Sequence, residues 1–127
     1  MTTPSQDSRV DATQLAYWRQ AAEHQQQQRQ AAVAIAWRQV EQIAVCLRRE
    51  FGATQVIVFG SLVRDRFTEA SDVDIAVAGV PANRYFEAVA RVNELSDRWV
   101  DLKPLEALEP YFRERVLMTG VAVDAID

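Results

Sequence analysis

Between Asp11 and Gly52 the chain contains neither glycine nor proline, and in the second half of this segment apolar residues recur at three- and four-residue steps. The recurring positions are Val33, Ala36, Val40, Ile43, Ala44, Leu47 and Phe51. Such spacing puts them on one side of a helix, and that side must pack against other apolar groups. Asp11 and Gln14 have the spacing of an N-terminal capping pair, and Gly52 suits a left-handed C-terminal cap. The pattern predicts one long helix, or two in tandem, over residues 11–51, with residues 33–51 packed on the rest of the domain.

The first half of this segment carries a weaker apolar pattern. Leu15, Trp18 and Ala22 form only a thin stripe, and residues 24–28 are polar on every side. A helix with so little apolar surface has little reason to lie against a core. We therefore expect this half to project from the domain or to clasp a partner, with Trp18 and the neighbouring Tyr17 as candidates for a protein interface.

Beyond Gly52, short apolar runs alternate with stretches of helical spacing. Runs of strand length cover residues 55–59, 72–78, 99–103 and, near the end of the chain, 121–123. Helices are expected over residues 62–66, 83–95 and 105–118, with Ser61 as the N-cap of the first. The alternation of helices and strands predicts an α/β fold, with a small mixed β-sheet packed with helices and preceded by the long N-terminal helix or helix pair.

Length and charge narrow the class of protein. A chain of 127 residues has room for one domain with a full core. We expect a mobile tail at residues 1–10, the helical residues 11–51, and the core of the domain at residues 52–127. Fourteen Lys and Arg against eighteen Asp and Glu give a net charge of −4, which disfavours nucleic acid as a direct substrate. A single cysteine, the lack of a signal-peptide pattern and the lack of an apolar run of about 20 residues predict a cytoplasmic protein without a membrane span.

The most informative stretch begins at Gly60 and Ser61, after the first predicted strand, and continues through ten residues to Asp72 and Asp74. Side chains two positions apart in a strand point the same way, so the two aspartates present their carboxylates on one face. Two such carboxylates repel unless a cation lies between them, and their oxygens suit Mg²⁺ that arrives with the phosphates of a nucleotide. Gly60 allows close approach of a phosphate, and Ser61 adds a hydroxyl and free N–H groups. The stretch predicts a triphosphate cradle beside a metal site.

A third carboxylate, Asp101, lies in the third predicted strand between two apolar residues. If that strand neighbours the second, Asp101 joins Asp72 and Asp74 in a cluster that holds two metal ions, or it acts as general base toward an incoming hydroxyl. Three such groups predict nucleotidyl transfer, in which an acceptor hydroxyl attacks the α-phosphorus of a nucleoside triphosphate and pyrophosphate leaves.

Other charged residues near this stretch have more than one interpretation. Arg64 is a candidate for contact with phosphate oxygens. Lys103, the only lysine of the chain, shares a face with Asp101 and either approaches phosphate, pairs with a carboxylate or lies at a solvated strand end. Residues 113–115 of the last predicted helix are interpreted as a solvated face, with contact to a partner as the alternative.

The spacing of these groups resembles the signature of the polymerase-β-type nucleotidyltransferase superfamily, and more closely that of its minimal nucleotidyltransferases (MNT). The resemblance covers roughly residues 40–125 and includes the C-terminal segment 109–120. It implies the nucleotidyltransferase fold, with nucleotide-binding residues Gly60, Ser61 and Arg64 and with Mg²⁺-binding and catalytic residues Asp72, Asp74 and Asp101. One position departs from the pattern, because Asp65 stands where such proteins commonly have glycine.

The resemblance also implies a partner. Minimal nucleotidyltransferases often pair with a small helical HEPN ribonuclease toxin, and such a protein transfers AMP from ATP to a tyrosine hydroxyl of the toxin and silences it. On this basis we expect a Mg²⁺-dependent protein adenylyltransferase with two ions, acting as the antitoxin of a HEPN/MNT hetero-oligomer. Two alternatives stay open, namely a binding module that blocks the toxin sterically and a transferase that modifies a small molecule such as an aminoglycoside.

Overall fold

The computed structural model describes residues 11–124, so the mobile tail predicted at residues 1–10 and residues 125–127 of the predicted core lie outside the described residues. The elements in chain order, with η denoting a 3-10 helix, are α2 (Ala12–Phe51), β1 (Gln55–Phe59), η1 (Gly60–Leu62), β2 (Val73–Ala78), η2 (Ala82–Arg84), α3 (Tyr85–Glu94), β3 (Val100–Pro104), η3 (Leu105–Ala107), α4 (Pro110–Thr119) and β4 (Val121–Ala122).

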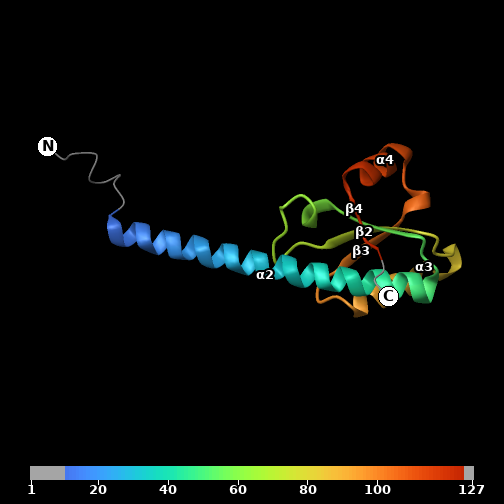
Figure 1. Cartoon of the computed structure of the whole chain (residues 1–127), viewed down its shortest axis with the longest axis horizontal. Helices are drawn as coiled ribbons and strands as arrows, with labels where there is room; N and C mark the ends of the chain where they lie inside the picture. The colour runs from blue at the N-terminus through green and yellow to red at the C-terminus, as the bar shows by residue number, and fades with distance from the viewer. Residues whose placement is uncertain (1–10, 125–127) are drawn as a thin grey trace.

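One continuous helix, α2, forms the whole N-terminal segment (Figure 1). At its start the Asp11 carboxylate accepts a hydrogen bond from the backbone N–H of Gln14 at 2.8 Å, and the Gln14 side chain accepts one from the backbone N–H of Asp11. At its end Gly52 has a φ of 74°, and its N–H donates to the carbonyl of Arg48. Because both ends are capped and no helix breaker lies between them, the first of the two predicted alternatives, a single helix, is confirmed.

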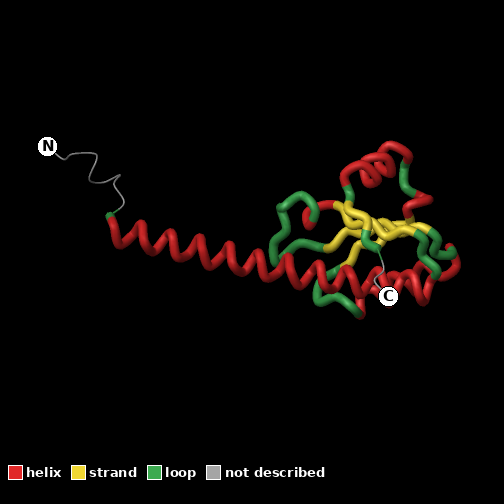
Figure 2. The backbone as a smooth tube through the Cα atoms, in the orientation of Figure 1, coloured by secondary structure: helices red, strands yellow, loops and turns green. Residues whose placement is uncertain are grey.

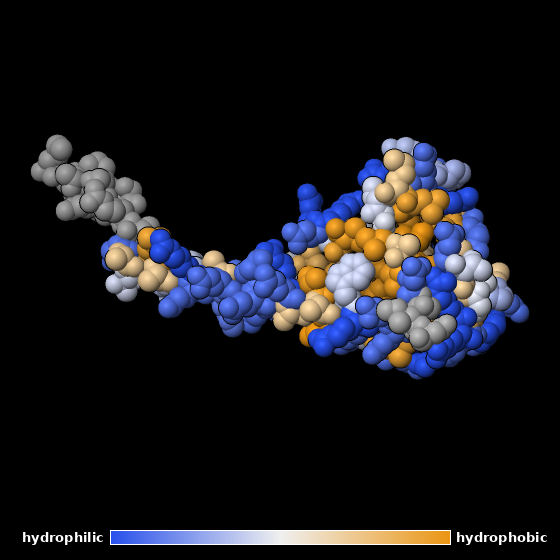
Figure 3. All heavy atoms as spheres, in the orientation of Figure 1, coloured by the Kyte–Doolittle hydropathy of each residue, from blue (hydrophilic) through white to orange (hydrophobic). Residues whose placement is uncertain are grey.

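The N-terminal part of α2 extends away from the rest of the molecule, as Figure 2 shows. None of residues 12–31 is buried, whereas the buried positions of the helix begin at Ala32. The surface of the extended part is mostly hydrophilic (Figure 3). This part also exposes two aromatic residues, Tyr17 at 65% and Trp18 at 64%, whose rings contact each other edge to face. The projection predicted from the weak apolar stripe is therefore observed.

Four strands form one mixed sheet in the order β3-β2-β1-β4. Strand β1 is antiparallel to β2 and to β4, whereas β2 and β3 are parallel. Helix α3 connects β2 to β3, which supplies the crossover that a parallel pair requires. This architecture confirms the predicted α/β fold with a small mixed sheet.

The two faces of the sheet have different covers. Val58 and Ile75 point into the larger apolar core, which includes residues of the second half of α2 and of α3. Ile57 and Ala76 point to the opposite face, where they cluster with Val116 of α4. Figure 1 shows α4 on one side of the sheet and α2 and α3 on the other. The helix α4 is short, so it gives its face of the sheet only a partial cover.

The predicted helix over residues 62–66 is wrong, and Ser61 is not an N-cap. Gly60–Leu62 form a single 3-10 turn that has no side-chain cap and passes into further turns. The physical reason is Asp65, whose φ of 59° is left-handed and ends any right-handed helical run at this point.

The last predicted helix also begins later than expected. It starts at Pro110 because proline suits the first turn of a helix and because the Glu109 carboxylate accepts hydrogen bonds from two backbone N–H groups of that turn. The residues from Leu105 to Ala107 form a separate 3-10 turn. Likewise, α3 begins at Tyr85, after the 3-10 turn η2. Within residues 11–124, no helix is long and apolar enough to cross a membrane.

Candidate functional site

Two of the predicted carboxylates meet on neighbouring strands. Asp74 of β2 and Asp101 of β3 are register partners in the parallel pair. Because side chains alternate along a strand, Asp74 shares the face of Ala76, which belongs to the cluster under α4. The residues on either side of Asp101, Val100 and Leu102, point into the larger core, so Asp101 faces the other way. Both carboxyl groups therefore lie side by side on the α4 face of the sheet.

The electrostatics of Asp74 reflect this arrangement. The pKa of its carboxyl group is raised above the ordinary value, first by partial burial and then by the negative charges of Asp101 and Asp72. Lys103 opposes this effect and lowers the pKa of Asp74. The Lys103 Nζ lies 3.2 Å from Oδ2 of Asp101, so of its three interpretations, pairing with a carboxylate is the one observed. The negative charges of Asp101 and Asp72 thus act on the Asp74 carboxylate, and a cation bound there would offset them.

Asp72 contributes from a more open position. It lies just before β2 rather than inside the strand, and it is exposed to solvent. The next residue, Val73, donates its N–H to the carbonyl of Trp99 at 3.0 Å, which ties this end of β2 to the start of β3. Asp72 is therefore held at the edge of the site but has more freedom than Asp74.

Gly60 lies against the carboxylate of Asp74. Its φ is 79°, a left-handed conformation that side chains rarely permit. A Cβ atom at this position would come 2.2 Å from Oδ2 of Asp74 and 3.1 Å from its Cγ. The sequence predicted that glycine here allows a phosphate to approach, and the structure adds a second reason. The missing side chain makes room for a carboxylate of the site itself.

Ser61 and Arg64 follow in a tight turn. The Gly60 carbonyl accepts hydrogen bonds from the backbone N–H groups of Val63 and Arg64, both at 3.1 Å. Ser61 is partly buried, and Arg64 is exposed. Asp65 has the only positive φ of any non-glycine residue in the described part of the chain. Aspartate tolerates this conformation better than most residues, so Asp65 preserves the backbone that a glycine in this place would allow.

One residue that the sequence analysis missed, Arg98, positions the loop in front of Asp72. Its side chain is only 14% exposed, and its guanidinium carbon lies 4.5 Å from the ring centroid of Phe67. Its Nη1 donates to three backbone carbonyls of the loop, those of Thr68, Glu69 and Ser71, at 3.0, 3.2 and 2.8 Å. No sequence pattern identifies such a residue, because it acts on backbone carbonyls of a distant segment.

A cavity of about 240 Å³ opens beside Gly60, between the end of β1 and α4. It is lined by Phe59, Gly60, Arg64, Tyr111, Phe112, Arg115, Val116 and Thr119. No carboxylate belongs to this lining, although Gly60 borders both the cavity and Asp74. The cavity therefore extends the candidate site toward α4.

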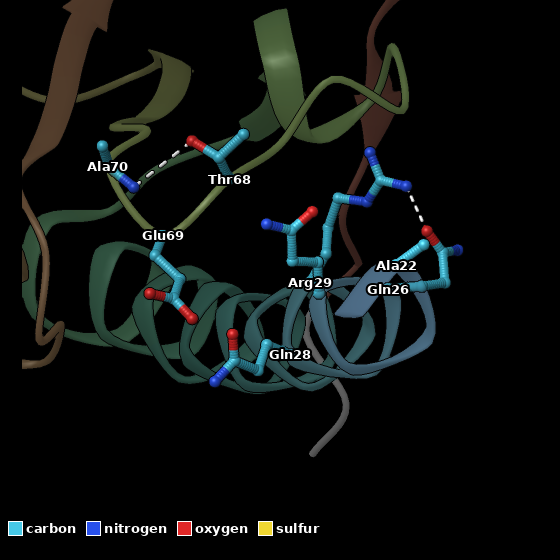
Figure 4. A pocket seen from close by; sticks show the side chains of 8 residues that line it. Ala22, Gln26, Gln28, Arg29, Thr68, Glu69 and Ala70 are labelled. Atoms are coloured by element: carbon cyan, nitrogen blue, oxygen red, sulfur yellow. Dashed lines mark hydrogen bonds between the residues drawn. The ribbon is translucent and has the colours of Figure 1, made fainter. Parts of the chain in front are cut away.

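A wider cavity of about 630 Å³ lies elsewhere, between α2 and the loop from Thr68 to Ala70 (Figure 4). Its lining on α2 is mainly glutamine, with Arg29 hydrogen-bonded to Gln26. Figure 4 shows the side chain of Glu69 pointing toward α2. None of the three predicted catalytic aspartates lines this cavity, so its size alone does not make it the reactive centre.

The carboxylates fit a metal ion that is shared with a substrate. In the described residues, no three His, Cys, Asp or Glu side chains are grouped closely enough to hold an ion among themselves. Asp74 and Asp101 nevertheless provide two adjacent hard oxygen donors whose repulsion a cation would relieve. Mg²⁺ commonly takes one or two carboxylates and completes its shell with water and substrate phosphates. This donor set suits such an ion better than an ion caged by protein alone.

Comparison with protein families agrees with this geometry. The nucleotidyltransferase domain family matches residues 40–123, a range that contains every predicted site residue. The chain belongs to this family. The match begins within α2, so the projecting part of that helix lies outside the nucleotidyltransferase domain.

Solved structures share the fold of this nucleotidyltransferase. One described as a minimal nucleotidyltransferase is 29% identical, with a TM-score of 0.58, and the match covers 68% of this chain and 91% of that one. A toxin–antitoxin structure with AMP-PNP is 22% identical, with a TM-score of 0.58 and coverage of 68% and 74%. A mutant of the toxin–antitoxin MntA–HpeT is 20% identical, with a TM-score of 0.55 and the same coverage. No curated protein sequence matches the chain. The predicted nucleotidyltransferase fold is confirmed.

Proposed function

We propose that this nucleotidyltransferase uses two Mg²⁺ ions to transfer AMP from ATP to a tyrosine hydroxyl of a HEPN ribonuclease toxin, and that it thereby acts in the cytoplasm as the antitoxin of a hetero-oligomer. The observation that carries the transferase activity is the pairing of Asp74 with Asp101 in adjacent strands, with Gly60 shaped around the first carboxylate. The toxin–antitoxin structures with the same fold, one of them with AMP-PNP, support the donor and the partner.

In the proposed reaction the acceptor hydroxyl oxygen attacks the α-phosphorus of ATP. A P–O bond forms to the acceptor, the bond to the β-phosphate oxygen breaks, and pyrophosphate leaves with the electron pair. Asp101 takes the hydroxyl proton, since its carboxylate lies beside Asp74 and its side chain is 40% exposed to an incoming acceptor. Gly60 and Ser61 hold the triphosphate, and Asp72, Asp74 and Asp101 would hold the ions. Bound Mg²⁺ supplies neutralisation of the phosphate charge.

The projecting half of α2 favours a second contribution, direct binding of the toxin. None of residues 12–31 is buried, and these residues lie outside the family match and expose Tyr17 and Trp18. Exposed tryptophan and tyrosine are typical of interface centres. We therefore propose that this half of α2 docks on the toxin. If docking alone silenced the toxin, the protein would be a steric antitoxin, which is the competing function.

Intact-mass spectrometry of the toxin separates the two functions. The toxin is incubated with the full chain, Mg²⁺ and each of the four nucleoside triphosphates in turn, and its ribonuclease activity is measured in parallel. The variants are Asp74→Asn and, as a matched control that also removes one negative charge, Glu41→Gln on the exposed surface of α2.

The proposal predicts that the toxin gains the mass of AMP and loses ribonuclease activity with the wild-type chain and with Glu41→Gln, but not with Asp74→Asn. A toxin that is silenced equally by Asp74→Asn, without gaining mass, would show that the protein acts sterically. A mass gain on a small molecule in the absence of any toxin would favour the aminoglycoside type of transferase.

A further inference from the structure

The cavity beside Gly60 is lined by two arginines and three aromatic residues. Tyr111 and Arg115 are four residues apart on α4, so they lie on the same side of the helix and both line the cavity. Arg64 lines it from the turn after β1. We propose that this cavity is part of the nucleotide site, with Arg115 joining the already expected Arg64 in binding phosphate oxygens and with Tyr111 stacking on the base. This inference rests on the proposed function and assigns residues of α4 to it.

Arg64 and Arg115 are the first reason to place phosphate groups in this cavity. Among residues 11–124, neither guanidinium forms a hydrogen bond or an ion pair, although Arg64 and Arg115 border the same cavity. The lining contains no acidic side chain that could balance them. Two unpaired guanidinium groups in one concave site favour an anion with several oxygens, and phosphate groups match their planar donors. The charge of the cavity is thus opposite to that of the carboxylates on the other side of Gly60.

This separation of charge suits a nucleoside triphosphate. A triphosphate at Gly60 would have the carboxylates, with their metal ions, on one side and the arginines on the other. Both sides would neutralise its negative charge, which is how phosphoryl-transfer sites position their substrates. Arg113 takes no part, because its Nη2 donates to the carbonyls of Glu106 and Leu108 and holds the start of α4 in place.

The aromatic residues of the lining are the second reason, because they suit the base of a nucleotide. Phe59 and Phe112 contact each other edge to face, with ring centroids 5.7 Å apart, and form an apolar wall. Tyr111 is 66% exposed, and its ring forms no aromatic contact within the described part of the chain. A free aromatic face beside a phosphate site is suited to stacking on a nucleobase, whatever the identity of the base. The cavity therefore offers one group of residues for each half of a nucleotide.

Binding of two ligands to the full chain tests these assignments separately. Calorimetric titration with ATP and with inorganic tripolyphosphate, both with Mg²⁺, compares the wild type with Arg115→Gln and Tyr111→Ala. Arg38→Gln controls for the lost charge, and Phe86→Ala, which is 83% exposed on α3, controls for a lost surface aromatic ring. All four changed residues are exposed, so circular dichroism is expected to show unchanged folding.

Arg115→Gln is expected to weaken both ligands by about tenfold or more, as loss of a charge-assisted hydrogen bond does. Tyr111→Ala is expected to weaken ATP about tenfold and to leave tripolyphosphate unchanged. Affinities within twofold of the controls for both variants, with wild-type binding of ATP intact, would overturn this inference alone. Absence of ATP binding by the wild type would instead overturn the proposed function, and this inference with it.

Discussion

Replacing Gly60 by alanine tests how closely the turn η1 fits against Asp74 of β2. An alanine Cβ would come 2.2 Å from Oδ2 of Asp74, so the carboxylate must rotate or the turn must shift. The chain offers a matched control in Gly52, whose φ of 74° is nearly the same as the 79° of Gly60. A Cβ on Gly52 would have no atom within 4 Å. The two substitutions share the backbone penalty, and only Gly60→Ala adds a collision in the site.

The expected magnitudes follow from these contacts. A left-handed backbone costs an alanine about 1–2 kcal/mol, which sets the loss of unfolding free energy for Gly52→Ala. Displacing the Asp74 side chain from its preferred rotamer adds about 0.5–1.5 kcal/mol for Gly60→Ala. At roughly 4 °C per kcal/mol for a domain of this size, Tm is expected to fall by about 4–8 °C for Gly52→Ala and about 6–14 °C for Gly60→Ala.

Thermal unfolding and titration with Mg²⁺ and ATP together measure both consequences. We expect Gly60→Ala to lose at least about tenfold in affinity, because Asp74 no longer holds its place beside Asp101. We expect Gly52→Ala to bind like the wild type, since its position is remote from the carboxylates. Equal affinity of the two variants for Mg²⁺ and ATP would refute the reasoning that Gly60 is shaped around Asp74.

Three further predictions concern other residues near the site. The raised pKa of Asp74 means that the folded protein binds this proton more tightly than the unfolded chain, so the free energy of unfolding falls as the pH rises from about 4 through that pKa. Asp74→Asn is therefore expected to raise the Tm of the ion-free protein at pH 7 and to have little effect at pH 4, and a lower Tm at pH 7 would contradict this. Asp65→Gly is expected to change the free energy of unfolding by less than about 1 kcal/mol, whereas Asp65→Val is expected to lower it by about 1–2 kcal/mol in urea titrations, because valine resists the left-handed φ of 59°; equal stability of the two variants would argue against strain at this position. Arg98→Gln is expected to lower the free energy of unfolding by about 2 kcal/mol and to weaken binding of Mg²⁺ with ATP, because the loop before Asp72 loses its hydrogen bonds; unchanged hydrogen exchange in residues 68–72 would contradict this role.

The elements with strong local patterns were predictable from the sequence. The capping pair and the apolar spacing predicted helix over the range of α2, as one helix or two, and the continuous apolar run of β1 predicted a strand. The helix expected after Ser61 was wrong, because the backbone is left-handed at Asp65. A single residue with a positive φ leaves no periodic pattern in the sequence, so this break could not be predicted. The late start of α4 had a signal in Glu109 and Pro110, which form a cap and a first turn.

The site was predictable to the extent that it follows from strand geometry. The alternation of side chains placed Asp74 on one face, and the parallel pairing then brought Asp101 beside it. The collision that excludes a side chain at Gly60 could not be foreseen, since it depends on the distance between a turn and a neighbouring strand. Arg98 could not be foreseen either, because it bonds backbone carbonyls that are distant in the sequence.

The most direct test of the catalytic centre is anomalous diffraction from crystals grown with Mn²⁺ and a non-hydrolysable ATP analogue. We expect a manganese peak that is coordinated by Asp74 and Asp101 and by phosphate oxygens, with the triphosphate on the turn at Gly60. Ordered nucleotide elsewhere on the chain, or a manganese ion that contacts neither aspartate, would contradict the assignment of this edge of the sheet as the centre of nucleotidyl transfer.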